Sequence, residues 1–446
     1  MAPERAAPWA RRRLHFVGIG GAGMSGWATV ALELGARVSG SDRTDSPVLG
    51  ELRARGADVH AGHGAEHLPD GPDVEVVHST AVPADNPELV LARERGLRVM
   101  ARAELLHELT ALRRTIAVAG AHGKTTTTSM TAHVLLGCGM DPGYLVGGTL
   151  ATTGRNAAWG TGEWLVVEAD ESDRSMLALE VEVAVVTNVE LDHHATYGSL
   201  QEVREVFREF LARPEHAVIL DRPELLELRG GREAVAFDVP DPVLVPGGSR
   251  FFWRGLEVRL GVPGAHNARN AAAALEAARL AGADPRAAVA TIASFAGAGR
   301  RFETLGTTAA GALVVDDYAH HPTEVAATIA AGRTLAPGRL VAVFQPHLYS
   351  RTQHLAGAFG RALAAADLVC LLDVYPARER AQDFPGVSGR TVAAAVADAA
   401  PGREVLWMPS FDDAERVLRA RLRAGDLCLV MGAGDVRVLG ERLVAG

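Results

Sequence analysis

One segment, Thr115–Thr128 (TIAVAGAHGKTTTT), constrains the fold more strongly than any other part of the chain. The apolar run Ile116–Ala119 predicts a buried parallel strand, and the spacing of apolar residues after Lys124 predicts a helix. A glycine loop between such a strand and helix is typical of sites for nucleotide phosphates, because loop amides and the helix N-terminus face the anion. The lysine adds positive charge, and the first hydroxyl, Thr125, is suited to ligate Mg²⁺. The segment therefore predicts an α/β fold with a phosphate-binding loop.

The residues of this loop that we expect to bind nucleotide phosphate are Gly120, Ala121, His122, Gly123, Lys124, Thr125 and Thr126. Val118 stands where the usual motif has a glycine, so the loop is a shortened variant. The alternative is a fortuitous Gly-Lys-Thr sequence on a surface helix. Composition argues against that alternative, because all 45 Lys and Arg residues except Lys124 are arginines. We interpret the single lysine as a position that needs a compact ammonium, which a planar guanidinium does not replace.

Composition excludes several classes of protein. A length of 446 residues predicts about three domains, each able to bury its own core. A net charge of −9 argues against a general nucleic-acid or anionic-membrane surface. The cysteines, Cys138, Cys370 and Cys428, are far apart and suit a reducing cytoplasm. No apolar run approaches the roughly 20 residues of a membrane helix, so we expect a cytoplasmic protein without membrane insertion. We also expect a monomer or weak homodimer.

A second glycine-rich turn lies near the N-terminus. A strand predicted at Leu14–Ile19 leads into Gly18–Gly23 (GIGGAG), which matches G-x-G-x-x-G and precedes an apolar helix. The next predicted strand, Arg37–Gly40, leads to Asp42, at the position of a ribose-binding acid. Such a turn lets a diphosphate approach the backbone, but it does not distinguish NAD from another nucleotide diphosphate. Tight strand–helix packing without a ligand is the alternative.

The first predicted domain continues with strands at Val74–His78 and Arg98–Met100 and ends near Leu112. A polar loop, Ser79–Pro87, follows the first of these strands. Open α/β sheets bind ligands at the carboxyl ends of their strands. We therefore expect the start of this loop, including Thr80, to lie at the ligand-binding edge.

Two more predicted strands bring polar side chains to the phosphate loop. Trp164–Val167 precedes the acidic segment Glu168–Asp173, and Ala184–Val186 precedes Thr187–His194. The carboxyl ends of parallel strands share one edge, so Glu168 and His193 are expected near the Mg²⁺ held by Thr125. The alternatives are a solvated acidic turn and a pair of loop histidines.

Two further segments leave their roles open. His266–Asn270 precedes an alanine-rich helix predicted at Ala271–Ala281, where Asn and His side chains cap the helix or face a nucleotide base. Ser294–Glu303 is glycine-rich and basic and predicts a linker between domains. Its two arginines, Arg300 and Arg301, either reach phosphate or are solvated.

The last part of the chain predicts a third α/β domain. Four strands are expected, each followed by polar, aromatic or glycine residues that indicate a ligand-facing edge; these strands are Leu313–Val315, Leu340–Phe344, Leu368–Leu372 and Leu427–Val430. The sequence thus predicts an α/β protein of three consecutive domains. They are an N-terminal Rossmann-like domain (1–112), a central P-loop mononucleotide-binding domain (113–303) and a C-terminal Rossmann-like domain (304–446).

Eight segments, in order, resemble the successive motifs of the Mur ligase family. They are Gly18–Ser25, Gly120–Thr126, Glu168–Asp173, Thr187–His193, His266–Asn270, Arg300–Glu303, Asp316–Glu324 (DDYAHHPTE) and Gln345–Arg351 (QPHLYSR). The last two segments point to the alanine-adding branch of this family. The resemblance implies an ATP- and Mg²⁺-dependent ligase that joins L-alanine to the lactyl carboxylate of UDP-N-acetylmuramate through an acyl phosphate, for peptidoglycan synthesis. The alternatives are a tripeptide-recycling ligase of the same family, an NAD-dependent oxidoreductase, and a phosphate-loop switch or motor.

The resemblance also implies roles for individual residues. For the UDP substrate these residues are Gly20, Gly21, Ala22, Gly23, Met24, Ser25, Asp42, Ser79, Thr80 and His320. Lys124 would bind the β- and γ-phosphates of ATP, with Asn267, Asn270, Arg301 and Asp317 also around the nucleotide. Thr125 and Glu168 would ligate Mg²⁺ and His193 a second Mg²⁺. His347 and Arg351 would lie near the amino acid, and His193 or His347 would take the proton of its ammonium group.

The chain departs from the family pattern at two positions. Leu348 follows the histidine of QPH, where the family often has arginine, which puts one contact to the alanine carboxylate in doubt. Phe207 occupies the position of a carbamoylated lysine that bridges two metals in sister ligases. Because Lys124 is the only lysine, no such bridge forms here.

Overall fold

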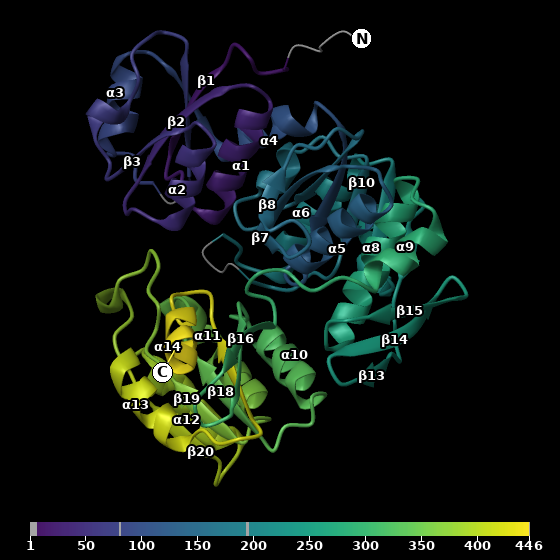
Figure 1. The fold of residues 1–446 in the computed structure, drawn as a ribbon, viewed down its shortest axis with the longest axis vertical. Coiled ribbons are helices and arrows are strands. Elements are labelled where there is room, and N and C mark those ends of the chain that lie inside the picture. Colours follow the sequence, from purple (N-terminus) through teal and green to yellow (C-terminus); the bar gives the residue numbers. More distant parts are fainter. Residues whose placement is uncertain (1–6, 80–81, 193–195, 446) are drawn as a thin grey trace. The chain divides into compact units, whose positions relative to one another are not determined.

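The structure, a computed structural model, describes residues 7–79, 82–192 and 196–445. The chain divides into two compact units (Figure 1). Unit 1 comprises Met1–Glu190, Leu200–Phe237 and Ala273–Ala288, and unit 2 comprises Leu191–Ser199, Asp238–Ala272 and Val289–Gly446.

The N-terminal part of unit 1 is a parallel five-stranded sheet of order β3-β2-β1-β4-β5. Its elements are β1 (Arg13–Val17), α1 (Ala22–Glu33), β2 (Arg37–Asp42), α2 (Pro47–Ala54), β3 (Asp58–Ala61), η1 (Ala65–His67), β4 (Val74–His78), α3 (Pro87–Glu94), β5 (Arg98–Ala101) and α4 (Arg102–Thr110). β2 and β4 pair with opposite sides of β1, so the strand order reverses there. The glycine turn between β1 and α1 therefore occupies the position where open α/β sheets bind ligands.

A buried carboxylate joins three elements of this sheet. Glu88 of α3 is fully enclosed and lies 2.7 Å from His15 Nε2 on β1, and it accepts a hydrogen bond of 2.7 Å from Ser41 Oγ on β2. Burial alone would raise the pKa of Glu88, but these hydrogen bonds outweigh it and lower the pKa. The ionised carboxylate thus fixes the end of β2, next to Asp42.

The second part of unit 1 is a seven-stranded sheet of order β12-β11-β10-β6-β9-β7-β8, in which only β8 is antiparallel to its neighbour. Its elements are β6 (Arg114–Ala119), α5 (Lys124–Gly137), β7 (Gly143–Leu150), β8 (Arg155–Ala158), β9 (Trp164–Glu168), η2 (Ser175–Ala178), β10 (Val183–Val186), α6 (Leu200–Ala212), β11 (His216–Leu220), α7 (Pro223–Leu226), η3 (Glu227–Arg229) and β12 (Val235–Phe237). β6 lies between β9 and β10, so the three strands predicted around the phosphate loop are adjacent and parallel.

An antiparallel sheet and two helices follow: β13 (Val243–Val245), β14 (Gly248–Trp253), β15 (Leu256–Leu260), α8 (Ala265–Leu280) and α9 (Pro285–Ile292). The predicted helix start at Ala271 was wrong, because α8 already begins at Ala265. Asn and His are weak helix formers. Here Asn267 Nδ2 donates to Pro263 O at 2.7 Å, and Asn270 Nδ2 donates to Asn267 Oδ1 at 3.3 Å, which stabilises the first turns.

Unit 2 also contains a six-stranded sheet of order β16-β17-β21-β18-β19-β20, with β16 antiparallel and the other strands parallel. Its elements are β16 (Glu303–Thr307), β17 (Leu313–Asp317), α10 (Pro322–Arg333), β18 (Arg339–Phe344), α11 (Tyr349–Leu363), β19 (Leu368–Leu371), η4 (Ala381–Asp383), α12 (Gly389–Ala399), β20 (Glu404–Trp407), α13 (Phe411–Arg421), β21 (Asp426–Met431) and α14 (Arg437–Ala445). The four strands predicted for this region are confirmed, and β16 and β20 are additional.

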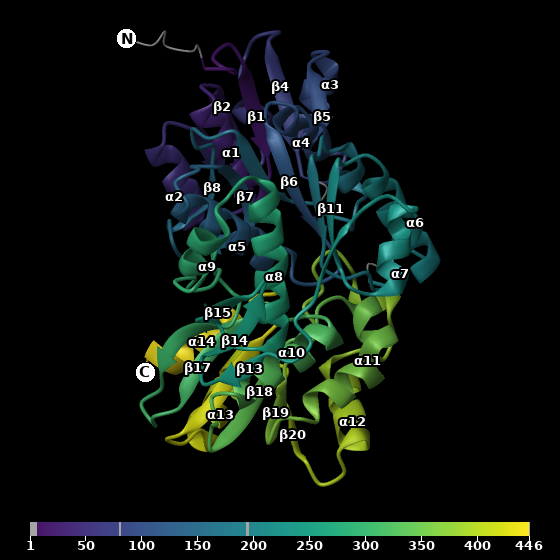
Figure 2. The same ribbon diagram turned by 90° about the vertical axis from the view of Figure 1, so that its right-hand side faces the viewer.

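Both faces of this sheet are covered by helices. Leu340, Ala342 and Phe344 of β18 pack with α10, α11 and α12, and α11 and α12 lie side by side (Figure 2). The alternate residues Val341 and Val343 pack with α13 and α14 on the other face. Burial on both faces explains why the strand is apolar throughout. The predicted α/β fold class is therefore confirmed.

None of the described helices is long and apolar enough to cross a membrane.

Candidate functional site

The phosphate loop joins β6 to α5 in a conformation that requires glycine. Gly120 has a φ of +141°, and a Cβ built on it would lie 2.1 Å from Thr187 Oγ1. Gly123, the residue before α5, has a left-handed φ of +80°. The chain thus turns directly from a buried strand into the N-terminus of α5, where free backbone amides attract anions.

Two residues after β10 hold this loop in place. Asn188 Oδ1 accepts a hydrogen bond of 2.9 Å from His122 N, and Asn188 Nδ2 donates one of 2.8 Å to His122 O. Thr187 Oγ1 donates to the same carbonyl at 2.6 Å. Sequence reasoning gave Thr187 and Asn188 no role, although they stand in the segment that resembles a family motif. Their amide and hydroxyl groups therefore fix the loop backbone.

The only lysine is held between the loop and the acidic segment. Lys124 Nζ donates to Gly120 O at 2.6 Å and to both carboxylate oxygens of Glu171 at 2.9 Å. Burial alone would lower the pKa of Lys124, but Glu171, Asp170 and Glu168 outweigh it and raise the pKa. The ammonium is therefore charged at neutral pH. Glu171 is a residue that sequence reasoning missed, because only Glu168 in its segment was given a role.

The predicted Mg²⁺ ligands of the described chain lie together. Thr125 Oγ1 donates to Glu168 Oε2 at 3.2 Å, and Gly147 N donates to Glu168 Oε1 at 2.6 Å. A hydroxyl and a carboxylate oxygen beside a phosphate loop are the donors that Mg²⁺ takes in such sites. These residues therefore fit the metal. His193 and Thr80 lie outside the described residues.

We predict that Gly120→Ala weakens the binding of an ATP analogue by at least about tenfold, because the added Cβ overlaps Thr187 Oγ1 and displaces the loop amides. Gly139→Ala is the matched control, since Gly139 also has a positive φ (+73°) but no atom within 4 Å of the built Cβ. Calorimetric titration of both variants measures the affinity. Equal affinity in the two variants would contradict the role given to the loop.

The N-terminal glycine turn has its predicted acidic partner. Gly20 N donates to Asp42 Oδ2 at 2.8 Å, and a Cβ on Gly18, whose φ is +83°, would lie 3.4 Å from Ser79 Cβ. The structure thus brings the turn, Asp42 and Ser79 together. Met24 and Ser25 are buried in the first turn of α1, and Ala22 is its first residue.

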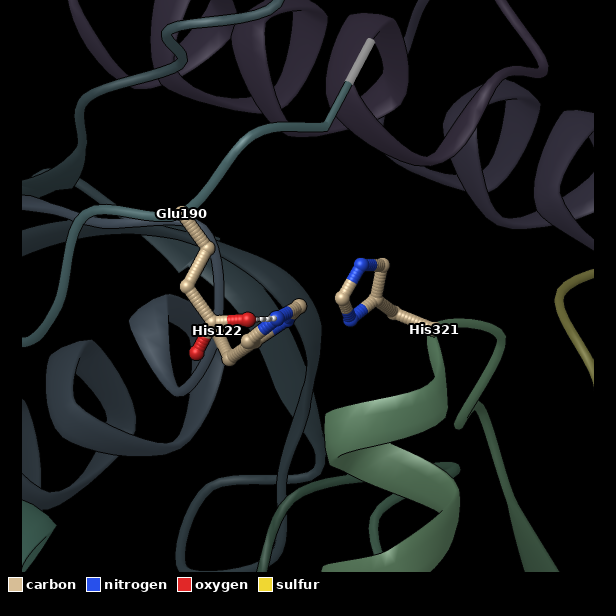
Figure 3. Close-up of side chains that lie close together, drawn as sticks. All are labelled: His122, Glu190 and His321. Carbon is tan, nitrogen blue, oxygen red and sulfur yellow. Dashed lines mark ion pairs between the residues drawn. The ribbon is translucent and has the colours of Figure 1, made fainter. Parts of the chain in front are cut away.

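His122 of the phosphate loop pairs with an acidic residue in the segment after β10. Its Nε2 lies 3.4 Å from Glu190 Oε2, the ion pair drawn in Figure 3. His321, the third side chain drawn there, belongs to unit 2 and precedes α10, where its Nδ1 accepts a hydrogen bond of 3.4 Å from Thr323 N.

In unit 2, the residues that we expected near the amino-acid substrate, His347 and Arg351, lie in a buried charged cluster. Arg351, in the first turn of α11, donates to Asp192 Oδ1 at 2.8 Å and to Asp192 Oδ2 at 3.1 Å through Nη2, and both side chains are 5% exposed. Arg351 Nη1 lies 3.1 Å from His347 Nδ1. Burial, His320 and Arg351 lower the pKa of His347 to about 3, so its imidazole is neutral at neutral pH. Asp192 was missed by sequence reasoning.

Three more of the predicted residues lie in unit 2: Asp317 at the end of β17, His320 after that strand, and Arg301 before β16. Asp317 accepts hydrogen bonds from Phe302 N at 2.9 Å and Ala319 N at 2.8 Å, and burial raises its pKa to about 6. Burial lowers the pKa of His320 to about 4, and its ring lies 5.8 Å from that of His347. Arg301 lies 3.5 Å from a carboxylate oxygen of Glu324.

The structure places the two residues that depart from the family pattern, Leu348 and Phe207, and Arg300, whose role the sequence left open. Leu348, which precedes α11, has a φ of +67° and is buried. Phe207 of α6 is fully buried and apolar. Arg300 is not a solvated linker residue, since its Nη2 donates to Gly432 O at 3.0 Å and its guanidinium lies over the ring of Tyr318.

Three family models match this chain in sequence order. The Mur ligase catalytic domain matches residues 13–114, the Mur ligase middle domain residues 118–278, and the Mur ligase glutamate ligase domain residues 300–434. Together they span most of the sequence, including both glycine turns and the cluster in unit 2. The chain belongs to the Mur ligase family, whose members are ATP-dependent ligases.

Named relatives are similar over nearly their whole length. The UDP-N-acetylmuramate–L-alanine ligase of Mycobacterium sp. (strain JLS) is 45% identical, over 97% of this chain and 95% of the relative. The ligase of the same name from Acidithiobacillus ferrooxidans (strain ATCC 53993 / BNL-5-31) is 47% identical over 96% of both chains. Among solved structures, UDP-N-acetylmuramate–alanine ligase from Thermotoga maritima is 28% identical with a TM-score of 0.82, covering 97% of this chain and 98% of that one. A murein peptide ligase from Psychrobacter arcticus 273-4 is 25% identical with a TM-score of 0.73 and the same coverage.

Proposed function

We propose that this chain is the ATP-dependent ligase that joins L-alanine to the lactyl carboxylate of UDP-N-acetylmuramate in peptidoglycan precursor synthesis. The observation that carries the proposal is the 45% and 47% identity to ligases named for this reaction, over nearly the whole chain. The phosphate loop, with its single lysine, supplies the chemistry that the reaction needs from the protein.

We propose three domains with separate ligands. Residues 1–112 bind the UDP moiety, 113–303 bind ATP, and 304–446 bind the amino acid; the three family-model ranges and the separate sheets support these bounds. Gly20–Ser25, Asp42, Ser79 and Thr80 would face the UDP substrate, with His320 at its sugar end.

The reaction requires activation of a carboxylate. A carboxylate does not react with an amine at neutral pH, because its leaving group would be oxide. Transfer of the γ-phosphoryl group of ATP to a carboxylate oxygen releases ADP and makes phosphate the leaving group. The alanine amine then attacks the acyl carbon, forms the amide bond, and releases phosphate and a proton. Lys124 and the amides of the loop position the phosphates and offset their charge.

Mg²⁺ would be held by Thr125 and Glu168, and a second Mg²⁺ would be held by His193. When bound, these ions would neutralise charge on the phosphates. Asn267, Asn270, Arg301 and Asp317 would contact the nucleotide. Arg351 is suited to bind the alanine carboxylate as a bidentate guanidinium. His193 and His347 are our candidates for the proton acceptor; the low pKa of His347 leaves it unprotonated but makes it a weak base.

We predict that sustained ADP release requires UDP-N-acetylmuramate, L-alanine and Mg²⁺ together, because without the amine the enzyme stops at the acyl phosphate after a single turnover. A coupled ADP assay with each component omitted in turn measures this requirement. A full rate without an amino acid would indicate a phosphate-loop switch or motor instead. NADH binding without ATP turnover would indicate an oxidoreductase.

The same assay distinguishes the second ligase class. The alternative is a tripeptide nucleophile, because the chain is also structurally similar to ligases named for joining a peptide to UDP-N-acetylmuramate. We expect L-alanine to support turnover and the L-alanyl-γ-D-glutamyl-meso-diaminopimelate tripeptide to support none. We also propose a cytoplasmic monomer or weak homodimer without nucleic-acid partners; the net charge of −9 argues against a nucleic-acid surface.

A further inference from the structure

Arg102 links two parts of unit 1 that the proposed function assigns to different ligands. It is the first residue of α4, directly after β5. Its Nη2 donates to Asp170 Oδ2 at 2.7 Å and lies 3.3 Å from Asp173 Oδ2. Its Nη1 faces the glycine turn, because a Cβ built on Gly23 would lie 3.7 Å from that atom. The guanidinium therefore lies between the glycine turn and the acidic segment.

The acidic segment, Glu168–Asp173, also contacts the phosphate loop. Glu168 accepts a hydrogen bond from Thr125, and Glu171 accepts two from Lys124. Asp170, which binds Arg102, lies between these two glutamates in the sequence. A change in the contacts of Arg102 therefore acts on the segment that holds both the lysine and the proposed metal ligand.

The elements around Arg102 are packed together, so a change at the glycine turn can reach the acidic segment. α4 packs against η2, which follows the acidic segment. His107 Nδ1 lies 2.7 Å from Ala178 O, and Thr110 Oγ1 accepts a hydrogen bond of 3.0 Å from Glu180 N. α1 packs against β7 and β8 in the same unit. The glycine turn and the phosphate loop are thus joined through packed elements as well as through Arg102.

We propose that Arg102 is a positioning residue that couples an anion bound at the turn Gly20–Gly23 to nucleotide binding at the phosphate loop. The inference rests on the proposed function, which takes this anion to be the diphosphate of UDP-N-acetylmuramate. Two anionic ligands in one unit repel each other, and a guanidinium between them offsets that repulsion. When Arg102 contacts both the bound diphosphate and Asp170, it also orders the segment that carries Glu168 and Glu171. The UDP substrate therefore tightens nucleotide binding, and by linkage the nucleotide tightens the UDP substrate equally.

The test is a coupling measurement on the full chain. The dissociation constant of β,γ-methylene-ATP with Mg²⁺ is measured by calorimetry without and with saturating UDP-N-acetylmuramate. We expect the UDP substrate to tighten nucleotide binding about fivefold or more in the wild type, and this factor to fall to one or below in Arg102→Met. Arg98→Met is the matched control and should keep the wild-type factor, because Arg98 pairs with Glu75 and Glu108 within the N-terminal part.

Asp170→Asn provides a second variant that leaves Arg102 in place. We expect it to bind UDP-N-acetylmuramate as the wild type does, but to show a reduced coupling factor, whereas Arg102→Met also loses about tenfold in UDP-substrate affinity. Thermal unfolding of each variant establishes that it is folded. Equal coupling factors in the wild type and both variants, or a wild-type factor of one, would overturn the inference while leaving the proposed function intact. Failure of the wild type to bind UDP-N-acetylmuramate at all would overturn both.

Discussion

Lys124→Met is expected to lower the rate of substrate-dependent ADP release by at least about a hundredfold, the scale lost when one preorganised donor to a developing charge is removed. Methionine retains the length of the side chain but not the ammonium that bonds Gly120 O and Glu171. The γ-phosphoryl transfer would then proceed without the nearest fixed positive charge of the loop. The coupled assay with all three substrates and Mg²⁺ measures the rate.

Lys124→Arg tests why the only lysine stands here. The guanidinium keeps the charge but is larger and planar, so we expect it to restore only a minor part of the rate. Thr128→Val is the matched control in α5, because its buried hydroxyl has no hydrogen-bond partner among the described residues. That variant should keep the wild-type rate. A near-normal rate in Lys124→Met, with an unchanged melting temperature, would reject the assigned role.

The sequence alone predicted the phosphate loop and its surroundings because local signals coincide there. Ile116–Ala119 is apolar and is followed by glycines whose backbone angles other residues rarely adopt. Strand–helix alternation then predicted that Glu168 would lie beside Thr125, and their side chains are 3.2 Å apart. Parallel topology places successive strand ends at one edge, so this contact followed from strand order.

The other contacts of the site could not be predicted, because they join residues that are far apart in the sequence. Asn188 and Glu171 bond groups far away in the sequence, and nothing in their spacing indicated which polar residue of each motif would do so. The pair formed by Asp192 and Arg351 joins residues 159 positions apart. Arg102 stands at the start of α4, and the sequence around it does not indicate that it pairs with Asp170, 68 positions later.

The elements that sequence reasoning missed have weak periodic signals. β14 has alternating exposure, but β13 and β12 are only three residues long. Short strands of this kind are stabilised by their neighbours more than by their own sequence. The early start of α8 has the same origin, because the hydrogen bonds of Asn267 and Asn270 offset their low helix propensity.

Asp192→Ala is expected to destabilise unit 2 by about 3–5 kcal/mol, the loss that follows removal of one partner from a buried ion pair. The guanidinium of Arg351 is almost fully buried, and the substitution removes the carboxylate that it binds through Nε and Nη2. Thermal and urea unfolding, followed with calorimetry to resolve separate transitions, measure the loss.

The double variant Asp192→Ala/Arg351→Met separates the unpaired charge from the lost contacts. With both charges removed, we expect most of the stability to return, because the cost of the single variant is mainly that of a buried arginine without its counter-ion. Asp413→Ala is the matched surface control, since Asp413 and Arg416 form an exposed pair 2.8 Å apart, and it should change stability by a small fraction of that loss. Equal losses in the buried and surface variants would show that the pair of Asp192 and Arg351 is solvated in solution. In that case Arg351 would be free to bind the carboxylate of alanine without first exchanging Asp192.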